Sequence, residues 1–194
     1  MRWARPRAAD VGRTRAGQDG AVTATSTDLR IRTATTTDWP AIWPIWHRVV
    51  SAGETYTWHP ATTEPAARAA WMAPPPAAVF VAERLVPAAG ARIVATAQLK
   101  PVQPGLGDHV ANAGFMVDPD QAGGGIGRRL AGHVLDEARR RGYTAMQFNA
   151  VVEANIRAVG LWRSLGFEVI GTVPRAFRHP SAGLVGLHIM HREL

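Results

Sequence analysis

The segment Asn112-Ala-Gly-Phe-Met-Val117-Asp-Pro-Asp-Gln-Ala-Gly-Gly-Gly-Ile-Gly127-Arg-Arg-Leu130 decides the fold. It begins with an apolar run that ends at Val117, continues through a glycine-rich turn, and ends in a helical pattern that starts at Ile126. This order predicts a strand, a loop and a helix. Glycines let backbone N–H groups approach a ligand closely, and the positive end of the helix dipole points into the same space. We therefore expect the turn to bind a phosphate or pyrophosphate.

Two other glycine-rich signatures fit this segment poorly. The Gly-Lys-Ser/Thr sequence that completes a P-loop is absent, and the glycine spacing does not match the dinucleotide fingerprint of a βαβ unit near a chain start. An NTPase or a dehydrogenase is therefore disfavoured. A turn that merely connects a strand to a helix is the remaining alternative.

The same segment can be written Val117-Asp-Pro119-Asp-Gln-Ala122-Gly123-Gly-Gly125-Ile-Gly127. In this form it resembles the acetyl-CoA motif of the GNAT-type N-acetyltransferase superfamily, Val-x-Pro-x-x-Arg/Gln-Gly-x-Gly-Ile/Leu-Gly. Ala122 stands where that family has Arg or Gln, and Gln121 lies one residue earlier. The resemblance implies acetyl-CoA as co-substrate, bound mostly by backbone N–H groups. It assigns the cofactor contacts of this segment to Phe115, Met116, Val117, Ala122, Gly123, Gly124, Gly125, Ile126, Gly127 and Arg128.

A second motif, Asn155-x-x-Ala158-x-x-Leu161-Trp162-x-x-x-Gly166-Phe167, resembles another pattern of the same superfamily in every spacing. The resemblance implies that Asn155 contacts the CoA arm. Trp162 replaces a Tyr that often protonates the departing thiolate. Because an indole N–H is a poor acid, we expect Trp162 to pack beside the cofactor, and water, another side chain or the ammonium product to protonate the thiolate. The implied reaction is direct attack of a neutral amine on the acetyl-CoA thioester in a ternary complex.

Two asparagines indicate where the amine that accepts the acetyl group would bind. Asn112 and Asn149 match residues that anchor the substrate in the branch of the superfamily that acetylates proline analogues such as azetidine-2-carboxylate, so the resemblance gives both a substrate-binding and catalytic role. An Asn side chain offers a donor and an acceptor, which suits an amino acid. Hydrogen bonding at a strand edge is the alternative. Tyr56 and Trp58 are expected to wall the pocket, or else to be core aromatics.

No general base is evident from the sequence. Glu54, His59, Asp108, His109 and Glu153 are candidates, and His109 is preferred because the ordinary pKa of histidine is near neutrality. A water relay is an equal alternative. Arg175 and Arg178 could pair with a substrate carboxylate, or they could be solvated loop residues.

Apolar patterns predict seven strands and four helices in the order β-α-α-β-β-β-α-β-α-β-β, which is the GNAT order. The resemblance therefore implies an α/β GNAT fold: a mixed, mostly antiparallel seven-stranded sheet with splayed fourth and fifth strands, flanked by about four helices. Pro44 is expected to kink the first helix or delay its regular part. The last two strands are expected at 167–171 and 184–190, with a separate segment between them.

Composition limits the function classes. The 194 residues are 46% hydrophobic and carry a net charge of +7. We expect a single acetyltransferase domain over 27–194 and a disordered, arginine-rich extension over 1–26. The sequence contains no cysteine, which excludes thiolate catalysis and cysteine metal sites, and we expect no metal. Arginines outside the extension are not clustered among aromatics, so we expect no nucleic-acid partner.

Hydropathy predicts no membrane partner, because no apolar run reaches about 18 residues. The amino terminus also lacks a secretory signal, and we expect a cytoplasmic protein. The resembled branch suggests a homodimer that acts on a small-molecule amine. Three alternatives remain: a protein or peptide N-acetyltransferase, a non-catalytic acyl-CoA sensor, and a nucleic-acid-associated module. Closure of the loops 54–60 and 174–183 over the site would favour a small acceptor over a peptide.

Overall fold

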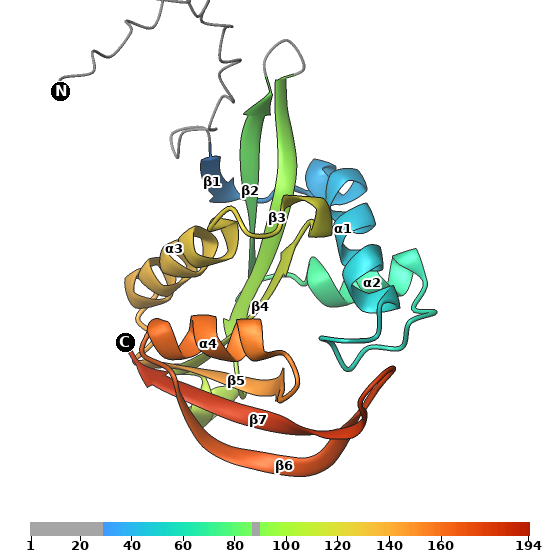
Figure 1. Ribbon diagram of the computed structural model, residues 1–194. Helices are drawn as coiled ribbons and strands as arrows, with labels where there is room; N and C mark the ends of the chain where they lie inside the picture. Colours follow the sequence, from blue (N-terminus) through green and yellow to red (C-terminus); the bar gives the residue numbers. More distant parts are fainter. Residues whose placement is uncertain (1–28, 87–89) are drawn as a thin grey trace, which may run out of the picture.

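The computed structural model describes residues 29–86 and 90–194, and the expected extension over 1–26 lies outside them. The described residues form a seven-stranded sheet with two helices on each face (Figure 1). The strands are β1 (Leu29–Thr33), β2 (Ala78–Val86), β3 (Gly90–Pro101), β4 (Val110–Val117), β5 (Ala145–Val152), β6 (Glu168–His179) and β7 (Gly183–Glu193). The helices are α1 (Trp39–Ser51), α2 (Glu64–Trp71), α3 (Ile126–Arg140) and α4 (Ile156–Ser164), with short 3₁₀ turns η2 (Thr36–Asp38), η3 (Gly105–Gly107) and η4 (Pro119–Gln121).

The strand order is β1-β2-β3-β4-β5-β7-β6. Neighbouring strands are antiparallel except β4 and β5, which are parallel and pair only at Val110 with Ala145 and at Ala111 with Met146. Beyond these pairs the two strands separate. The α/β GNAT fold with splayed fourth and fifth strands is therefore confirmed.

The two faces of the sheet bury separate apolar clusters. Along β2, side chains alternate between the faces: Phe80 packs in the cluster under α3 and α4, whereas Val79 and Val81 pack under α1 and α2. Strand β4 alternates in the same way. Asn112 lies four residues before Met116 and therefore points to the same face. Because Met116 packs in the cluster under α1 and α2, Asn112 also faces these helices. This assignment of faces decides which residues meet in the functional site.

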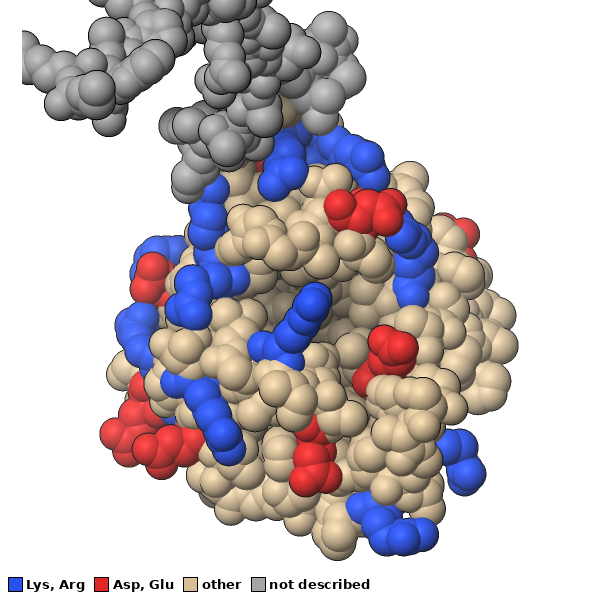
Figure 2. Space-filling view, viewed as in Figure 1, with Lys and Arg blue, Asp and Glu red and all other residues tan. Residues whose placement is uncertain are grey.

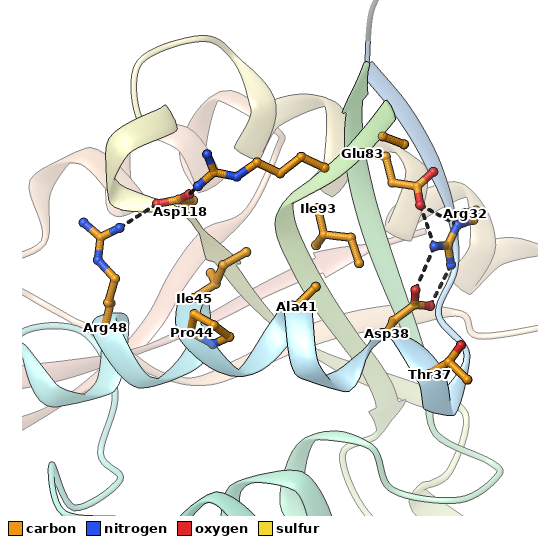
Figure 3. Close-up of a pocket in the computed structure, with 12 residues that line it drawn as sticks. Arg32, Thr37, Asp38, Ala41, Pro44, Ile45, Arg48, Glu83, Ile93 and Asp118 are labelled. Atoms are coloured by element: carbon orange, nitrogen blue, oxygen red, sulfur yellow. Dashed lines mark hydrogen bonds and ion pairs between the residues drawn. The ribbon is translucent and has the colours of Figure 1, made fainter. Parts of the chain in front are cut away.

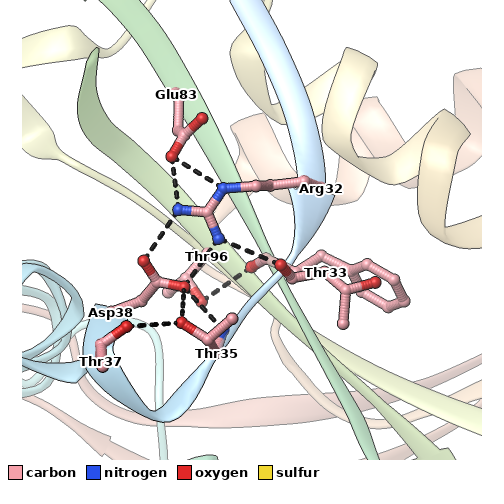
Figure 4. Close-up of polar contacts among 8 residues, drawn as sticks. Arg32, Thr33, Thr35, Thr37, Asp38, Glu83 and Thr96 are labelled. Atoms are coloured by element: carbon pink, nitrogen blue, oxygen red, sulfur yellow. Dashed lines mark hydrogen bonds and ion pairs between the residues drawn. The ribbon is translucent and has the colours of Figure 1, made fainter. Parts of the chain in front are cut away.

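A polar network fixes the start of α1 to the sheet (Figure 4). Arg32 of β1 donates two hydrogen bonds to the Asp38 carboxylate, of 2.7 and 2.8 Å, and a third of 2.9 Å to Glu83 of β2. Asp38 also accepts a 2.7 Å bond from the backbone N–H of Thr35. Hydrogen bonding from Arg32 holds the Asp38 pKa at about 2, below its ordinary value.

Strand β6 is longer than its apolar pattern predicts. It continues to His179, and most of the segment expected between the last two strands belongs to a hairpin with β7. Pro174 is tolerated because β6 is an edge strand, where a residue without an N–H need not break a ladder bond. The register shifts between Val173 and Phe177, and Arg175 has a positive φ of 54° within this irregularity.

Helix α1 runs through Pro44 to Ser51.

Candidate active site

A cleft of about 530 Å³ occupies the separation between β4 and β5. Val117, Asn155 and Trp162 line it on the α3 and α4 face, where the space-filling view shows a hollow (Figure 2). Residues of the opposite face line its other side, so one cavity receives groups from both faces of the sheet. Its lining comprises Val49, Thr55, Tyr56, Thr57, Trp58, Trp71, Gln98, Lys100, Pro101, Val102, Asn112, Ala113, Gly114, Phe115, Met116, Val117, Phe148, Asn149, Ala150, Val151, Val152, Asn155, Ala158 and Trp162.

The loop between α1 and α2 reaches into this cleft and contacts the backbone of β4. The hydroxyl of Tyr56 donates a 2.9 Å hydrogen bond to the carbonyl of Phe115 and accepts a 2.8 Å bond from its backbone N–H. Burial raises the pKa of Tyr56 above its ordinary value. The hydroxyl therefore stays protonated at neutral pH and can act as a hydrogen-bond donor.

Aromatic rings close the side of the cleft that faces α1 and α2. The rings of Tyr56 and Trp58 stack with centroids 5.1 Å apart, and Trp71 meets both of them edge-on. Gly114 allows this approach, because a Cβ atom there would lie 3.2 Å from the Trp71 ring and from the Tyr56 hydroxyl. The result is an apolar wall above β4 that a larger residue at Gly114 would disturb.

Amide side chains lie at the separation between the strands, and Asn112 bridges it. The Nδ2 group of Asn112 on β4 donates a 2.9 Å hydrogen bond to the carbonyl of Gln147 on β5. The Oδ1 atom of Asn149 accepts a 2.8 Å bond from Nε2 of Gln147. Asn112 thus has a strand-edge hydrogen bond and also lines the cleft. Its Oδ1 atom and the Nδ2 group of Asn149 have no hydrogen-bond partner among residues 29–86 and 90–194, and both can bind a ligand.

On the other face, Trp162 packs within an aromatic group. Its ring centroid lies 4.7 Å from that of Phe148 and 5.0 Å from that of Phe115, and the residue is 8% exposed. Asn155 caps α4, since its Oδ1 atom accepts a 3.1 Å hydrogen bond from the N–H of Ala158. Both motif residues therefore form the wall of the cleft beside α4.

The glycine-rich turn leads from β4 into α3. Gly123 and Gly125 have positive φ angles of 90° and 72°, which glycine adopts without strain. Gly127 lies between Val117, which lines the cleft, and Leu161 of α4; a Cβ atom there would lie 3.8 and 3.7 Å from their side chains. The first turn of α3 therefore begins next to the cleft, with its N–H groups available to an anion.

A buried carboxylate anchors the start of this turn. Asp118, which is 3% exposed, accepts hydrogen bonds of 3.0 Å from Arg48 of α1 and 2.9 Å from Arg92 of β3. It also accepts a 3.2 Å bond from the backbone N–H of Asp120, which pairs with Arg48 in turn. These contacts fix the turn relative to both α1 and the sheet.

A second cavity, of about 540 Å³, lies between α1 and β3 (Figure 3). Its charged lining residues are all paired with one another: Arg32 with Asp38 and Glu83, and Arg48 and Arg92 with Asp118. These charges therefore hold α1, the sheet and the glycine-rich turn together, and the ion pairs account for them without a ligand. The cleft between β4 and β5 is therefore the better candidate for the active site.

The cleft gathers residues from both sequence motifs and both predicted asparagines. The residues predicted as site residues that line it are Tyr56, Trp58, Asn112, Phe115, Met116, Val117, Asn149, Asn155 and Trp162. Ala122 to Arg128 form the turn and the first turn of α3 and do not line it. Trp71, Gln98 and Lys100 also line the cleft, and sequence reasoning missed all three. No local sequence signal indicated them, because their places depend on how the strands and α2 pack together.

The preferred base, His109, is exposed and precedes β4 at the end where β4 and β5 are paired. It does not line the cleft, and neither do Glu54, His59, Asp108 or Glu153. Within residues 29–86 and 90–194, no Asp, Glu or His side chain lines the cleft. Over the same residues, no three His, Cys, Asp or Glu side chains group to hold a metal. No helix in the described part of the chain is long and apolar enough to span a membrane.

Comparisons with known proteins identify the family. The model of the acetyltransferase (GNAT) family matches residues 39–167. A GCN5-related N-acetyltransferase from Kribbella flavida is 50% identical, with a TM-score of 0.81, over 86% of this chain and 98% of that chain. Ribosomal-protein-alanine N-acetyltransferase from Brucella melitensis is 28% identical, with a TM-score of 0.73, over 85% and 99%. A structure of yncA from Salmonella typhimurium with its cofactor acetyl-CoA is 26% identical, with a TM-score of 0.74, over 87% and 95%.

The matches to curated relatives are shorter: four of these relatives match over 75 to 80 residues each, and the chain spans between 12% and 38% of their length. The family model nevertheless covers more than half of the chain, including the glycine-rich turn and the Asn155 motif. The splayed strands and the cleft between them agree with this match. The chain belongs to the acetyltransferase (GNAT) family.

Proposed function

We propose that this protein transfers an acetyl group from acetyl-CoA to the amine of a small amino acid or proline analogue, by direct attack in a ternary complex. One observation carries the proposal: a single cleft between β4 and β5 is lined on one face by Val117, Asn155 and Trp162 of the two cofactor motifs and on the other by an aromatic wall. Two ligands can therefore meet within one cavity.

The turn and the α4 wall fit the cofactor. Glycines with positive φ expose backbone N–H groups at the start of α3, where the helix dipole favours the pyrophosphate. Phe115, Val117 and Trp162 provide an apolar channel for the pantetheine arm. Bound there, acetyl-CoA would supply the activated acetyl group, and this chain would supply orientation and hydrogen bonds.

The chain's own groups suit the transfer. At the opening between the strands, the N–H of Phe115 donates to the Tyr56 hydroxyl, which itself donates to the Phe115 carbonyl. A thioester carbonyl that replaces the Phe115 carbonyl as the acceptor would receive the hydrogen bond of Tyr56, which stabilises negative charge on its oxygen. The acceptor nitrogen forms a bond to the acetyl carbon as the carbon–sulfur bond breaks. Because the described lining contains no Asp, Glu or His, we propose that water carries away the amine proton and that the thiolate receives a proton from water or the ammonium product.

The wall formed by Thr55 to Trp58 supports a small acceptor. This part of the loop between α1 and α2 covers the cleft, and Asn112 and Asn149 offer an acceptor and a donor for an amino acid. The hairpin of β6 and β7 beyond Val173, in contrast, does not line the cleft, so only the first of the two loops whose closure would favour a small acceptor lines the site. We therefore assign the acceptor end of the site to the aromatic loop and the two asparagines.

Acetylation of a protein amine is the second candidate. It is favoured by the likeness to the ribosomal-protein-alanine N-acetyltransferase of Brucella melitensis. A peptide would have to enter past the loop that carries Tyr56 and Trp58. The two candidates therefore predict different acceptors for the same cofactor site.

Thiol release from acetyl-CoA would test the proposal against a panel of amines: azetidine-2-carboxylate, hydroxyproline, methionine sulfoximine, a polyamine, an aminoglycoside and a short peptide. We expect turnover with the small amino acids and its loss in Asn149→Ala, whose thermal unfolding should match the wild type. Turnover confined to the peptide would favour the second candidate. Tight binding of acetyl-CoA without turnover of any amine would contradict both.

A further inference from the structure

We propose that Lys100 binds the carboxylate of the acceptor and so makes this enzyme selective for amines that carry an adjacent carboxylate. The inference rests on the proposed function and narrows its substrate class. Lys100 is the only lysine of the sequence, and its side chain is exposed at the cleft.

The position of Lys100 follows from strand register. Lys100 of β3 lies directly opposite Asn112 of β4, so the two side chains project from the same face of the sheet. Gln98 and Gly114 form the next pair on that face, and Gly114 lies against the Trp71 ring and the Tyr56 hydroxyl. Lys100 thus stands on the acceptor side of the cleft, beside the asparagine already assigned to the acceptor.

The charge of Lys100 is uncompensated. Among the described residues that line the cleft, it is the only one with a charged side chain. Over residues 29–86 and 90–194, it forms no ion pair and no side-chain hydrogen bond, whereas Arg32 and Arg48 bind carboxylates. A cleft with one unpaired cation and no anion in its described lining is complementary to an anionic group and repels a second cation.

Most neighbouring polar groups already have partners. Nε2 of Gln98 donates to the carbonyls of Ala70 and Trp71, at 2.8 and 2.7 Å, and Thr96 accepts a 3.0 Å bond from the Trp71 indole. In the described part of the chain, Lys100, Oδ1 of Asn112 and Nδ2 of Asn149 have no partner and can bind a ligand. In an α-amino acid the carboxylate and the amine are close together. Lys100 and Asn112 are also close, because opposite residues in a sheet are neighbours. One amino acid can therefore place its carboxylate at Lys100 and its amine near Asn112.

The arginines expected from sequence to pair with a carboxylate do not compete for this role. Arg175 and Arg178 lie on β6 in the hairpin with β7, and neither lines the cleft. Both are exposed. They therefore provide matched controls for removing a positive charge away from the acceptor side of the cleft.

The test pairs a change in the protein with a change in the substrate. Steady-state kcat/KM would be measured for azetidine-2-carboxylate and its neutral carboxamide in the wild type, Lys100→Met, Lys100→Arg and Arg178→Met. We expect the wild type to prefer the carboxylate by about tenfold, as for a hydrogen bond between charged groups. Lys100→Met should abolish this preference through the KM of the carboxylate. Lys100→Arg should retain part of it, and Arg178→Met all of it.

The outcomes separate the inference from the proposed function. An unchanged preference in Lys100→Met, or its loss in Arg178→Met instead, would overturn the role of Lys100. Equal turnover of the acid and its amide by the wild type would also overturn it, while leaving N-acetyl transfer to small amines intact. A wild type that acetylates no small amino acid in the amine panel would overturn the proposed function itself. Because Lys100 is exposed, thermal unfolding should confirm that each variant is folded.

Discussion

The hydroxyl of Tyr56 bonds to both backbone polar groups of Phe115, at 2.8 Å from the nitrogen and 2.9 Å from the oxygen. One side chain from the loop between α1 and α2 therefore forms hydrogen bonds with the backbone of β4 at a point where β5 no longer pairs with it. This contact joins the aromatic wall on the acceptor side to the strand that is assigned to the cofactor.

Tyr56→Phe should weaken catalysis more than folding. The variant keeps the ring that stacks on Trp58 but loses the hydroxyl that we propose donates a hydrogen bond to the thioester carbonyl, so we expect kcat to fall about tenfold or more. The lost hydrogen bonds should lower the free energy of unfolding by about 1–2 kcal/mol. Tyr143→Phe is the matched control, because Tyr143 does not line the cleft. Equal kcat values for the two variants would contradict a catalytic role for the Tyr56 hydroxyl.

Gly114→Ala should disturb the acceptor wall. The added methyl group would lie 3.2 Å from Trp71 and the Tyr56 hydroxyl, which is closer than ordinary contact. We expect a loss of about 1–3 kcal/mol in the free energy of unfolding and a raised KM for the acceptor. Gly160→Ala, in open space on α4, should instead gain roughly 0.5–1 kcal/mol. Urea unfolding and steady-state kinetics on both variants would detect the difference; an unchanged acceptor KM in Gly114→Ala would count against this wall.

Much of this architecture could be predicted from the sequence because its signals are local. The glycine turn and the Asn155 motif specify their own backbone geometry, and period-two alternation predicts which side of β4 carries Asn112. The length of β6 could not be predicted, because Pro174 disfavours a strand unless its position at the sheet edge is known. An edge position is a tertiary property.

The chemistry of the site depended still more on tertiary structure. His109 lies only three residues before Asn112, but β4 and β5 are still paired at Val110 and Ala111, so the cleft opens beyond His109. Lys100 resembles a solvated charge in the sequence and becomes a site residue only through its register with Asn112. The place of His109 depends on the pairing of β4 with β5, and the place of Lys100 depends on the register of β3 with β4. Local sequence patterns specify neither pairing.

Acid should weaken the anchor at the start of α1. The Asp38 carboxylate has a pKa of about 2, compared with an ordinary value of 3.8, chiefly because Arg32 donates hydrogen bonds to it. A lowered pKa in the folded state means that this contribution to stability is present above pH 3.8 and is lost as the pH falls toward 2. Asp38→Asn should therefore flatten the decline in unfolding free energy over this window. Solvent screening keeps the difference below about 1 kcal/mol.

The measurement for Asp38 is urea unfolding at several pH values between 5 and 2, compared with the wild type. Asp108→Asn is a suitable control, because Asp108 is exposed and forms no ion pair among the described residues. Its pH profile should follow that of the wild type. A parallel decline in Asp38→Asn would show that the Arg32 network does not contribute in this pH range.

Asp118→Asn should weaken acetyl-CoA binding from outside the cofactor site. Asp118 holds the start of the glycine turn between Arg48 and Arg92, and an amide would lose the charge that both arginines contact. The arginines are partly exposed, so we expect only about 2 kcal/mol of lost stability, but a looser turn should raise the Kd for acetyl-CoA about tenfold. Asp120→Asn is the control, because Asp120 is exposed and contacts Arg48 at the turn surface. Calorimetric titration with acetyl-CoA would compare the two, and equal affinities would mean that the turn keeps its shape without the Asp118 anchor.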